Sequence, residues 1–373
     1  WATEGFLGSL LVASVSIEYE RLTASMATDR NSFQPLESLL QKGADLLRTR
    51  GLKPMFHSLD EEQQEVAILV DICWNLAIGA DERELLQECE VFFELCLVYS
   101  GARRTTLSSL RTCFLASVFL CSSLLRMMGR PSSINDSICS RAIDAANEVR
   151  RQIDLLSEFC NVKDVALYME TWVSLSVRLA CLMKDEQALE SIIDEVLRKF
   201  SPEPHFVVKL AASVMGWSEQ SDTAQSSFRR SAMTLATECF QASIDLYLAS
   251  LISSSTENDN SQILESVAAA YRELLMVVVS LHDASGMDEF RGAQSLASRY
   301  PETFPAIEMR WLACFAWERA RYHELGQNYR EAKEWMEEVR RVIQISPRRA
   351  GLAGALSEVE AFLNRNNLSP ANS

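Results

Sequence analysis

The chain has 373 residues, of which 36 are Lys or Arg and 51 are Asp or Glu, so its formal net charge is −15. Hydrophobic residues make up 48% of it, which is ample for a folded core, whereas 13 Gly and 9 Pro are too few for a turn-rich all-β protein. The negative charge argues against direct nucleic-acid binding, because a DNA-binding surface needs clustered Lys and Arg.

The first predicted hairpin lies between residues 58 and 101. Ser58 and Glu61 have the spacing of a capping box, with Ser at the N-cap and Glu at N3. The helix that follows is predicted to end at Gly79, and the next to begin at 81–84 and end at Gly101. Helices this close in sequence must run antiparallel. The residues predicted to face inward are Val66, Leu69, Val70, Cys73 and Leu76 in the first helix, and Leu85, Cys89, Phe92, Phe93 and Cys96 in the second.

Further helical segments follow at short intervals along the chain. The uncharged run 112–125, within an apolar helix predicted over 105–128, is shorter than the ~20 residues of a membrane span, so it predicts a buried helix and no membrane association. Residues 218–223 and 253–261 are polar and predict loops. The remaining helices are predicted at 133–160, 163–184, 186–200, 203–217, 225–252, 261–284 and 287–298.

Residues 306–347 form the clearest predicted hairpin, which resembles a tetratricopeptide (TPR) unit. Its first helix is apolar around much of its circumference and is expected to have neighbours on both sides. In the second helix the apolar stripe is Tyr329, Ala332, Met336, Val339 and Ile343, opposite Lys333, Glu334, Glu337, Glu338, Arg340 and Arg341. The residues predicted to make the packing of this repeat are Trp311, Gly326 at the turn, Tyr329, Ala332, Trp335 and Met336.

A terminal capping helix is predicted at 349–363. Because a helical hairpin cannot bury its faces alone and must stack on others, we expect residues 1–373 to form a single all-α, right-handed superhelical solenoid of degenerate, TPR-like antiparallel hairpins. The intervals between hairpins vary, so a strict period of about 34 residues is not kept. The sequence opens on Trp1, which suggests a fragment of a longer chain.

The sequence offers little material for catalysis, and we expect no catalytic residue, metal site, cofactor or small-molecule substrate. The acidic run 60–62 falls in the first turn of a helix, where the dipole favours carboxylates. Ten Cys without a C-x-x-C motif indicate reduced core thiols in a cytosolic or nuclear protein. An all-α lipid enzyme would need an Asp-rich metal motif, and none is present. The four His are not at ligand spacing, and His323 is expected at the surface or an edge: His57, His205, His282 and His323.

The protein is therefore expected to function by binding other proteins through its surface. Tryptophan often dominates protein interfaces, but within a helix it also anchors the packing of helix pairs. Packing is the simpler interpretation for Trp74, whereas Asn75, an interior helical Asn, either caps a local backbone group or meets a partner. Each of the other helical tryptophans is likewise interpreted either as packing between helices, the simpler interpretation, or as an interface residue: Trp172, Trp311, Trp317 and Trp335.

Several segments together resemble a known family over roughly residues 61–363. They are Asp71-Ile-Cys-Trp-Asn-Leu-Ala77, Phe92-Phe-Glu-Leu-Cys-Leu-Val-Tyr99, Arg111-Thr-Cys-Phe-Leu-Ala116 and the block Trp311 to Met336. They are similar, in the same order, to the C-terminal half of the meiotic TPR scaffolds that promote crossovers. This family is known as Spo-twenty-two, Zip-four and testis-expressed eleven.

The resemblance implies a non-catalytic scaffold on meiotic chromosomes in the nucleus. Such a scaffold promotes crossover formation and synaptonemal complex assembly through protein partners, including XPF-like recombination proteins and axis or central-region components. Family members often carry an aromatic–Asn pair in the penultimate helix region, implicated in partner contact. The matching position is Trp317-Glu318, while Trp74-Asn75 keeps a Trp–Asn pair in an earlier helix, so these four residues are the candidate partner contacts.

The alternative is a generic TPR-type adaptor of a cytosolic or nuclear multiprotein machine. A TPR groove that clamps a peptide carboxylate needs Lys, Arg and Asn side chains aligned on its inner helices. That alignment is not evident in the sequence, so the meiotic scaffold is the leading hypothesis.

Overall fold

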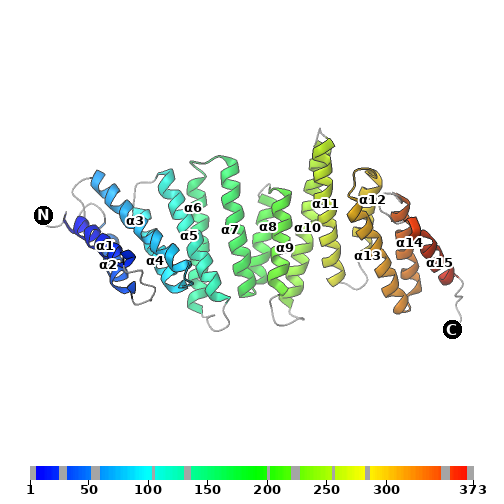
Figure 1. Ribbon diagram of the computed structural model, residues 1–373, viewed down its shortest axis with the longest axis horizontal. Helices are drawn as coiled ribbons and strands as arrows, with labels where there is room; N and C mark the ends of the chain where they lie inside the picture. The colour runs from blue at the N-terminus through cyan, green and yellow to red at the C-terminus, as the bar shows by residue number, and fades with distance from the viewer. Residues whose placement is uncertain are drawn as a thin grey trace. The chain divides into compact units, whose positions relative to one another are not determined.

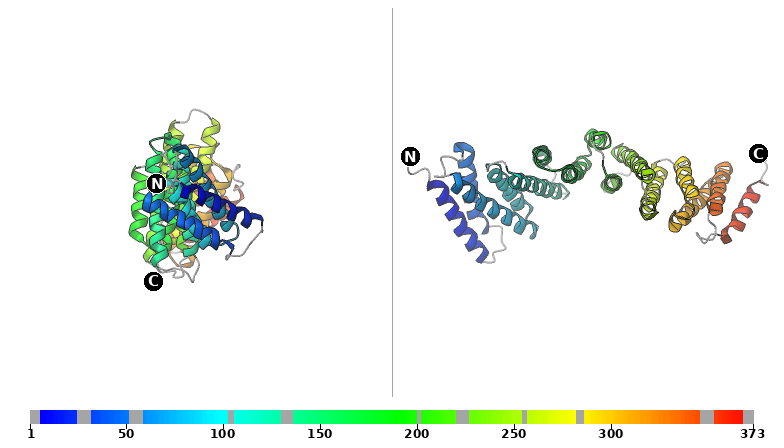
Figure 2. Two further views of the ribbon diagram at one scale, coloured as in Figure 1. Left: turned by 90° about the vertical axis from the view of Figure 1, so that its left-hand side faces the viewer. Right: turned by 90° about the horizontal axis from the view of Figure 1, so that it is seen from above.

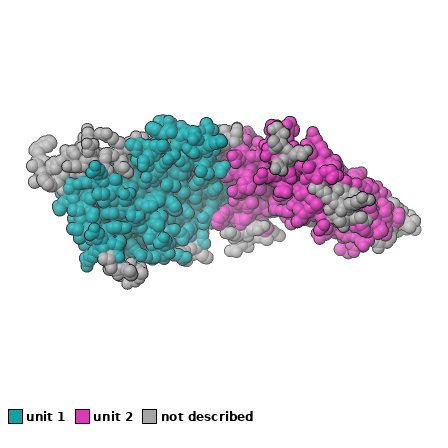
Figure 3. All heavy atoms as spheres, turned by 45° about the horizontal axis from the view of Figure 1, so that its top comes forward, with its two compact units in different colours: residues 1–192 teal, residues 193–373 magenta. Residues whose placement is uncertain are grey.

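The computed structural model describes residues 6–24, 32–51, 59–102, 106–129, 136–199, 202–219, 227–253, 257–281, 286–345 and 353–367. Across these ranges the chain forms fifteen α-helices and one short 3-10 turn, with no β-strand. The all-α prediction is confirmed. The described helices divide into two compact units, residues 1–192 and 193–373, with the division inside α8 (Glu186–Lys199) (Figure 3).

In the first unit α1 packs against α2, and the helices from α3 to α7 pack against one another in series (Figure 1). Contacts join α3 to α4, α4 to α5, α5 to α6 and α6 to α7, and they also join α1 to α3, α2 to α4 and α5 to α7. This pattern of first and second neighbours is the one that stacked helical hairpins produce. The helices are α1 (Phe6–Ala24), α2 (Gln34–Arg50), α3 (Leu59–Asp81), α4 (Leu86–Ala102), α5 (Leu107–Met128), α6 (Asp136–Leu156) and α7 (Val162–Met183).

The second unit repeats this pattern. Contacts join α9 to α10, α10 to α11, α13 to α14 and α14 to α15, while α12 contacts α11, α13 and α14 (Figures 1 and 2). The arrangement of antiparallel hairpins in series is therefore found in both units; the right-handed course of one continuous solenoid stays a prediction. The helices are α9 (Pro204–Glu219), α10 (Ser227–Ser253), α11 (Glu257–Leu281), α12 (Met287–Arg299), α13 (Ala306–Leu325), α14 (Tyr329–Ile345) and α15 (Leu356–Asn367).

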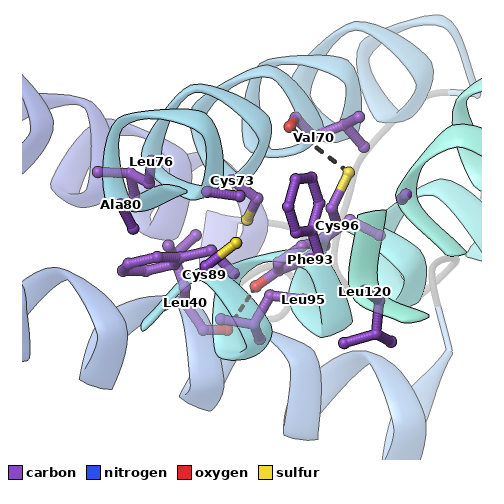
Figure 4. Packing of buried hydrophobic residues seen from close by; sticks show 14 of the residues in the cluster. Leu40, Val70, Cys73, Leu76, Ala80, Cys89, Phe93, Leu95, Cys96 and Leu120 are labelled. Atoms are coloured by element: carbon purple, nitrogen blue, oxygen red, sulfur yellow. Dashed lines mark hydrogen bonds between the residues drawn. The ribbon is translucent and has the colours of Figure 1, made fainter. Parts of the chain in front are cut away.

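The core of the first unit is built where α3 and α4 face each other. Cys73, Phe93 and Cys96 are completely buried, and the Cys96 thiol points to the carbonyl oxygen of Val70, 4.0 Å away (Figure 4). The inward-facing residues of the first predicted hairpin are confirmed, all being buried except Leu85, which is half-buried.

The predicted boundary between these two helices is wrong. The helix does not stop at Gly79 but continues to Asp81, because the next residue, Ala80, is fully buried and its packing outweighs the propensity cost of one glycine. Residues 82–84 form the turn instead of opening the next helix, and Glu84 takes the left-handed conformation with φ of 58°. The capping Ser58 lies outside the described residues.

The apolar run 112–125 lies in α5, which packs against α4, α6 and α7 as expected of a buried helix. Thr106 and Ser109 form a capping box at its start, and Gly129 caps its end. By length and composition alone, α5 and α7 among the described helices could cross a membrane, but 56% of the most apolar stretch of α5 is buried inside the protein. Burial of that kind is typical of a core helix.

Three other predicted boundaries shift. α6 ends at Leu156 rather than near residue 160, because residues 157–159 form a turn. α11 begins at Glu257, inside the segment 253–261 that was predicted to be a loop, since a polar first turn does not prevent a helix whose later turns are buried. The described part of the terminal helix is α15, at Leu356–Asn367 rather than 349–363.

Candidate interaction surface

Trp74 and Asn75 are neighbours on α3 that differ in burial. The Trp74 indole is half-buried and meets the rings of Phe93 and Phe119 edge-on, each with ring centroids 5.6 Å apart. The two phenyl rings stack on each other at 5.4 Å, so Trp74 completes an aromatic cluster that joins α3, α4 and α5. Its role in this structure is packing.

Asn75, in contrast, is exposed on the outer face of α3, beside Asp71 and the 42%-exposed Ile68. None of the hydrogen bonds among the described residues involves its amide. Local backbone capping is therefore absent, and of the two interpretations of Asn75, contact with a partner is the one that the geometry leaves open.

Trp317 and Glu318 on α13 also differ in burial. Trp317 is half-buried, with its ring 6.3 Å from that of Phe362 on α15, so it helps to hold the terminal helix. Glu318 is exposed. In both candidate pairs the tryptophan is half-buried by its packing, and the neighbouring polar residue is the more exposed member.

The predicted packing of the C-terminal repeat is largely present. Ala332, Trp335 and Met336 are buried in α14, and Trp335 meets Phe290 and Phe315 edge-on at centroid distances of 5.3 Å and 5.9 Å. The small Ala332 lies on the buried side of this helix, as expected of a close helix pair.

Other details of this repeat differ from prediction. Tyr329 is 47% exposed, because it is the first residue of α14 and lies beyond the packed turns. Gly326 keeps a φ of −77°, and the left-handed position of the turn is taken by Gln327, with φ of 61°. Trp311 stacks on Phe315 at 5.0 Å but remains half-buried. Gly326 therefore lies in the turn without being its strained residue.

Two polar residues expected at the surface or at an edge are buried. His323 is 6% exposed, and its Nδ1 lies 3.0 Å from the Glu331 carboxylate, which ties the end of α13 to the first turn of α14. Glu338, placed on the polar face of α14 by its spacing, is 1% exposed. Its carboxylate binds Arg291 of α12 at 3.0 Å and Arg341 at 2.8 Å, so this charge is buried because two guanidinium groups reach it.

The described residues provide no group of three His, Cys, Asp or Glu side chains placed to hold a metal ion. The acidic residues 60–62 do fall in the first turn of α3, but their side chains lie outside the described part of the structure. Burial raises the pKa of the Cys96 and Cys121 thiols to about 12 and also raises the pKa of Cys73. Such thiols stay protonated near neutral pH, which argues against a nucleophilic role.

The sequence interpretation missed several exposed apolar residues of α13. Ile307 is 73% exposed, Tyr322 50% and Leu325 77%, although α13 does have neighbours in α11, α12 and α14. The sequence does indicate that these residues share one helix face, because they recur at three- and four-residue intervals with Trp311, Cys314 and Glu318.

No family model and no curated protein matches the chain. Among solved structures, 13 chains match, one of them described as a circular tandem repeat protein with novel repeat topology and enhanced subunit contact surfaces. The match has a TM-score of 0.49 at 15% sequence identity and covers 97% of this chain and 90% of that one. At this level the likeness carries nothing about function.

Proposed function

We propose that this chain is a non-catalytic protein–protein interaction scaffold. The observation that carries the proposal is the combination of hairpins packed in series with helix faces that stay uncovered, such as the exposed side of α13. Arrays of this kind present extended surfaces to other proteins. The buried, protonated thiols and the lack of a metal-ligand group among the described residues are in keeping with it.

Proteins rather than nucleic acids are the proposed partners. Arg150 and Arg151 bind the carboxylates of Asp154 and Glu148, and Arg341 binds Glu338. These guanidinium groups are therefore engaged within the protein, in a chain whose net charge is −15. Phosphate contacts would need free, clustered cations.

The finer proposal is a scaffold that promotes meiotic crossover formation and synaptonemal complex assembly in the nucleus. It is supported by the resemblance of segments such as 71–77 and 311–336 to the meiotic TPR scaffolds. XPF-like recombination proteins and axis or central-region components are the partners that this resemblance suggests. A generic TPR-type adaptor of another multiprotein machine is the alternative.

The localisation of the protein in the cell distinguishes the meiotic scaffold from the generic adaptor. The full-length protein, tagged with a fluorescent protein and expressed from its own promoter, is imaged on spread chromosomes through meiotic prophase. Discrete foci on paired chromosomes are expected. A diffuse cytoplasmic signal at every stage would contradict the meiotic proposal and favour the adaptor.

A further inference from the structure

One face of α13 exposes a straight line of side chains, which we name the α13 stripe. Its members recur at intervals of four, three, four, four and three residues, the spacing of the seam in a coiled coil. The line extends for about 27 Å at the rise of an α-helix. Ile307, Tyr322 and Leu325 are at least half exposed, Cys314 is exposed and Trp311 is half-buried. The α13 stripe consists of Ile307, Trp311, Cys314, Glu318, Tyr322 and Leu325.

The rest of α13 is occupied by packing within the second unit. Its buried residues include Met309, Leu312 and Ala316, which lie on the other sides of the helix, where α11, α12 and α14 make their contacts. Single exposed apolar residues are ordinary on protein surfaces. A line of five apolar or aromatic side chains over five helical turns, interrupted only by Glu318, is not, and it indicates a site for another macromolecule.

Glu318 is the charged member of this line. It is exposed, and none of the ion pairs or hydrogen bonds of the described residues includes it. The nearby Arg321 is held by Glu324, so it does not neutralise Glu318. The stripe therefore presents apolar side chains on both sides of one carboxylate without an ion-pair partner in the described part of the chain, while the Arg319 guanidinium lies over the Tyr322 ring, 4.9 Å from its centroid.

We propose that the α13 stripe binds an amphipathic helix of a partner protein, with apolar side chains at three- and four-residue spacing and one Lys or Arg opposite Glu318. This rests on the proposed scaffold function and specifies the kind of partner. Amphipathic helices bind apolar helix faces through anchors at this spacing, and a matched charge fixes their register. A second copy of the chain fits less well, since pairing two stripes brings the Glu318 carboxylates within about one helical turn of each other.

The probe is a fluorescein-labelled synthetic helix of 21 residues with Leu at the stripe spacing and Lys at the position facing Glu318. A sister peptide carries Glu there instead. Fluorescence anisotropy with the full 373-residue chain is expected to show binding of the Lys peptide at least about 5-fold tighter than the Glu peptide, the ratio that ~1 kcal/mol of charge pairing gives. The Glu318→Lys variant should reverse the preference.

The apolar part is tested by the double variant Ile307→Ser/Leu325→Ser, which should weaken binding of the Lys peptide by about 10-fold or more. Ile252→Ser, on α10 and 79% exposed, is the matched control and should bind as the wild type does. Circular dichroism checks that each variant is folded. As an independent readout, bound Lys peptide should slow alkylation of Cys314 without changing that of the half-buried Cys139.

Three results would overturn the assignment. The first is the absence of binding by the Lys peptide, and the second is that Glu318→Lys still prefers the Lys peptide to the Glu peptide. The third is concentration-dependent dimerisation of the wild type that the double serine variant loses, which would assign the stripe to a second copy of the chain. If the peptide fails while the tagged protein still forms meiotic foci, only the α13 stripe is misassigned. If the peptide binds as expected and no foci form, the meiotic proposal fails and the stripe stands.

Discussion

The hydroxyl of Tyr99 donates a hydrogen bond to the carbonyl oxygen of Leu40 at 2.6 Å, and this bond joins α4 to α2 inside the first unit. Gly43 lies three residues further along α2. A Cβ atom there would collide with the Tyr99 hydroxyl and with a methyl group of Leu11 on α1. The absence of a side chain at Gly43 is what lets the three helices meet this closely.

Gly43→Ala should therefore destabilise the protein by about 1–3 kcal/mol, the range for overpacking a core, although alanine normally favours a helix. Denaturant unfolding measures the effect. Gly79→Ala is the matched control within α3, where a Cβ meets nothing within 4 Å, and it should stabilise by about 0.5–1 kcal/mol. Adding Tyr99→Phe to Gly43→Ala should recover part of the loss; equal effects of the two glycine variants would refute the explanation.

The ion pairs of Glu338 predict which of two variants loses more free energy of unfolding. Removing both guanidinium groups in Arg291→Ala/Arg341→Ala leaves a buried carboxylate without charge partners, and the free energy of unfolding should fall by more than about 2 kcal/mol. Glu338→Leu removes the buried charge itself, while the half-exposed arginines return to water, so it should cost less. Chemical denaturation gives both values, and the reverse order would show that the pairs do not offset the burial of Glu338.

Two glutamates should show opposite pH dependence. Burial raises the pKa of Glu90 above its ordinary value of 4.5 despite the contact with Arg141. The stability of the wild type relative to Glu90→Gln should then be greatest below pH 4.5 and fall as the pH rises through the raised pKa.

Glu148 provides the matched comparison. Burial would raise its pKa, but hydrogen bonds from Arg151 and Gln152 outweigh burial and lower it from 4.5. The stability of the wild type relative to Glu148→Gln should be fully present above pH 4.5 and be lost as the pH falls through the lowered pKa. Denaturant unfolding between pH 3 and pH 8 measures both differences, and slopes of the same sign would contradict the assignment of causes.

Thiol reactivity should follow burial. In the folded protein, iodoacetamide at neutral pH is expected to modify Cys314 first, because it is the exposed cysteine. Cys73, Cys96 and Cys121 are buried with raised pKa values and should react only after unfolding. Mass spectrometry of tryptic peptides over time gives the order, and early labelling of Cys96 would show that the α3–α4 core opens readily.

Helical periodicity predicted the fold class and the clearest hairpin correctly. In α14, Ala332, Met336, Val339 and Ile343 all lie on the buried side, because apolar spacing directly encodes the face that packs. Gly79 shows where local rules fail. Its weak helix propensity predicts a stop, but the burial of the next residue, a tertiary effect, carries the helix further.

The candidate site was harder to predict than the fold. A charge such as Glu338 looks solvated from its place on the helix, and only the approach of Arg291 from another helix explains its burial. The spacing of Ile307 and Leu325 places them on one face of a helix, but it does not say whether a neighbouring helix covers that face, and the structure leaves both residues exposed. Spacing gives the faces of a helix, whereas packing decides which face is left for a partner.

We propose that this chain is a scaffold for proteins of meiotic recombination. The most direct measurement is quantitative affinity purification of the tagged full-length protein from cells entering meiosis, compared with vegetative cells expressing the same amount. Meiosis-specific enrichment of XPF-like recombination proteins, or of axis or central-region components, is expected. Recovery of the same chaperones or ubiquitin-ligase subunits from both kinds of cell, with no recombination protein, would contradict it.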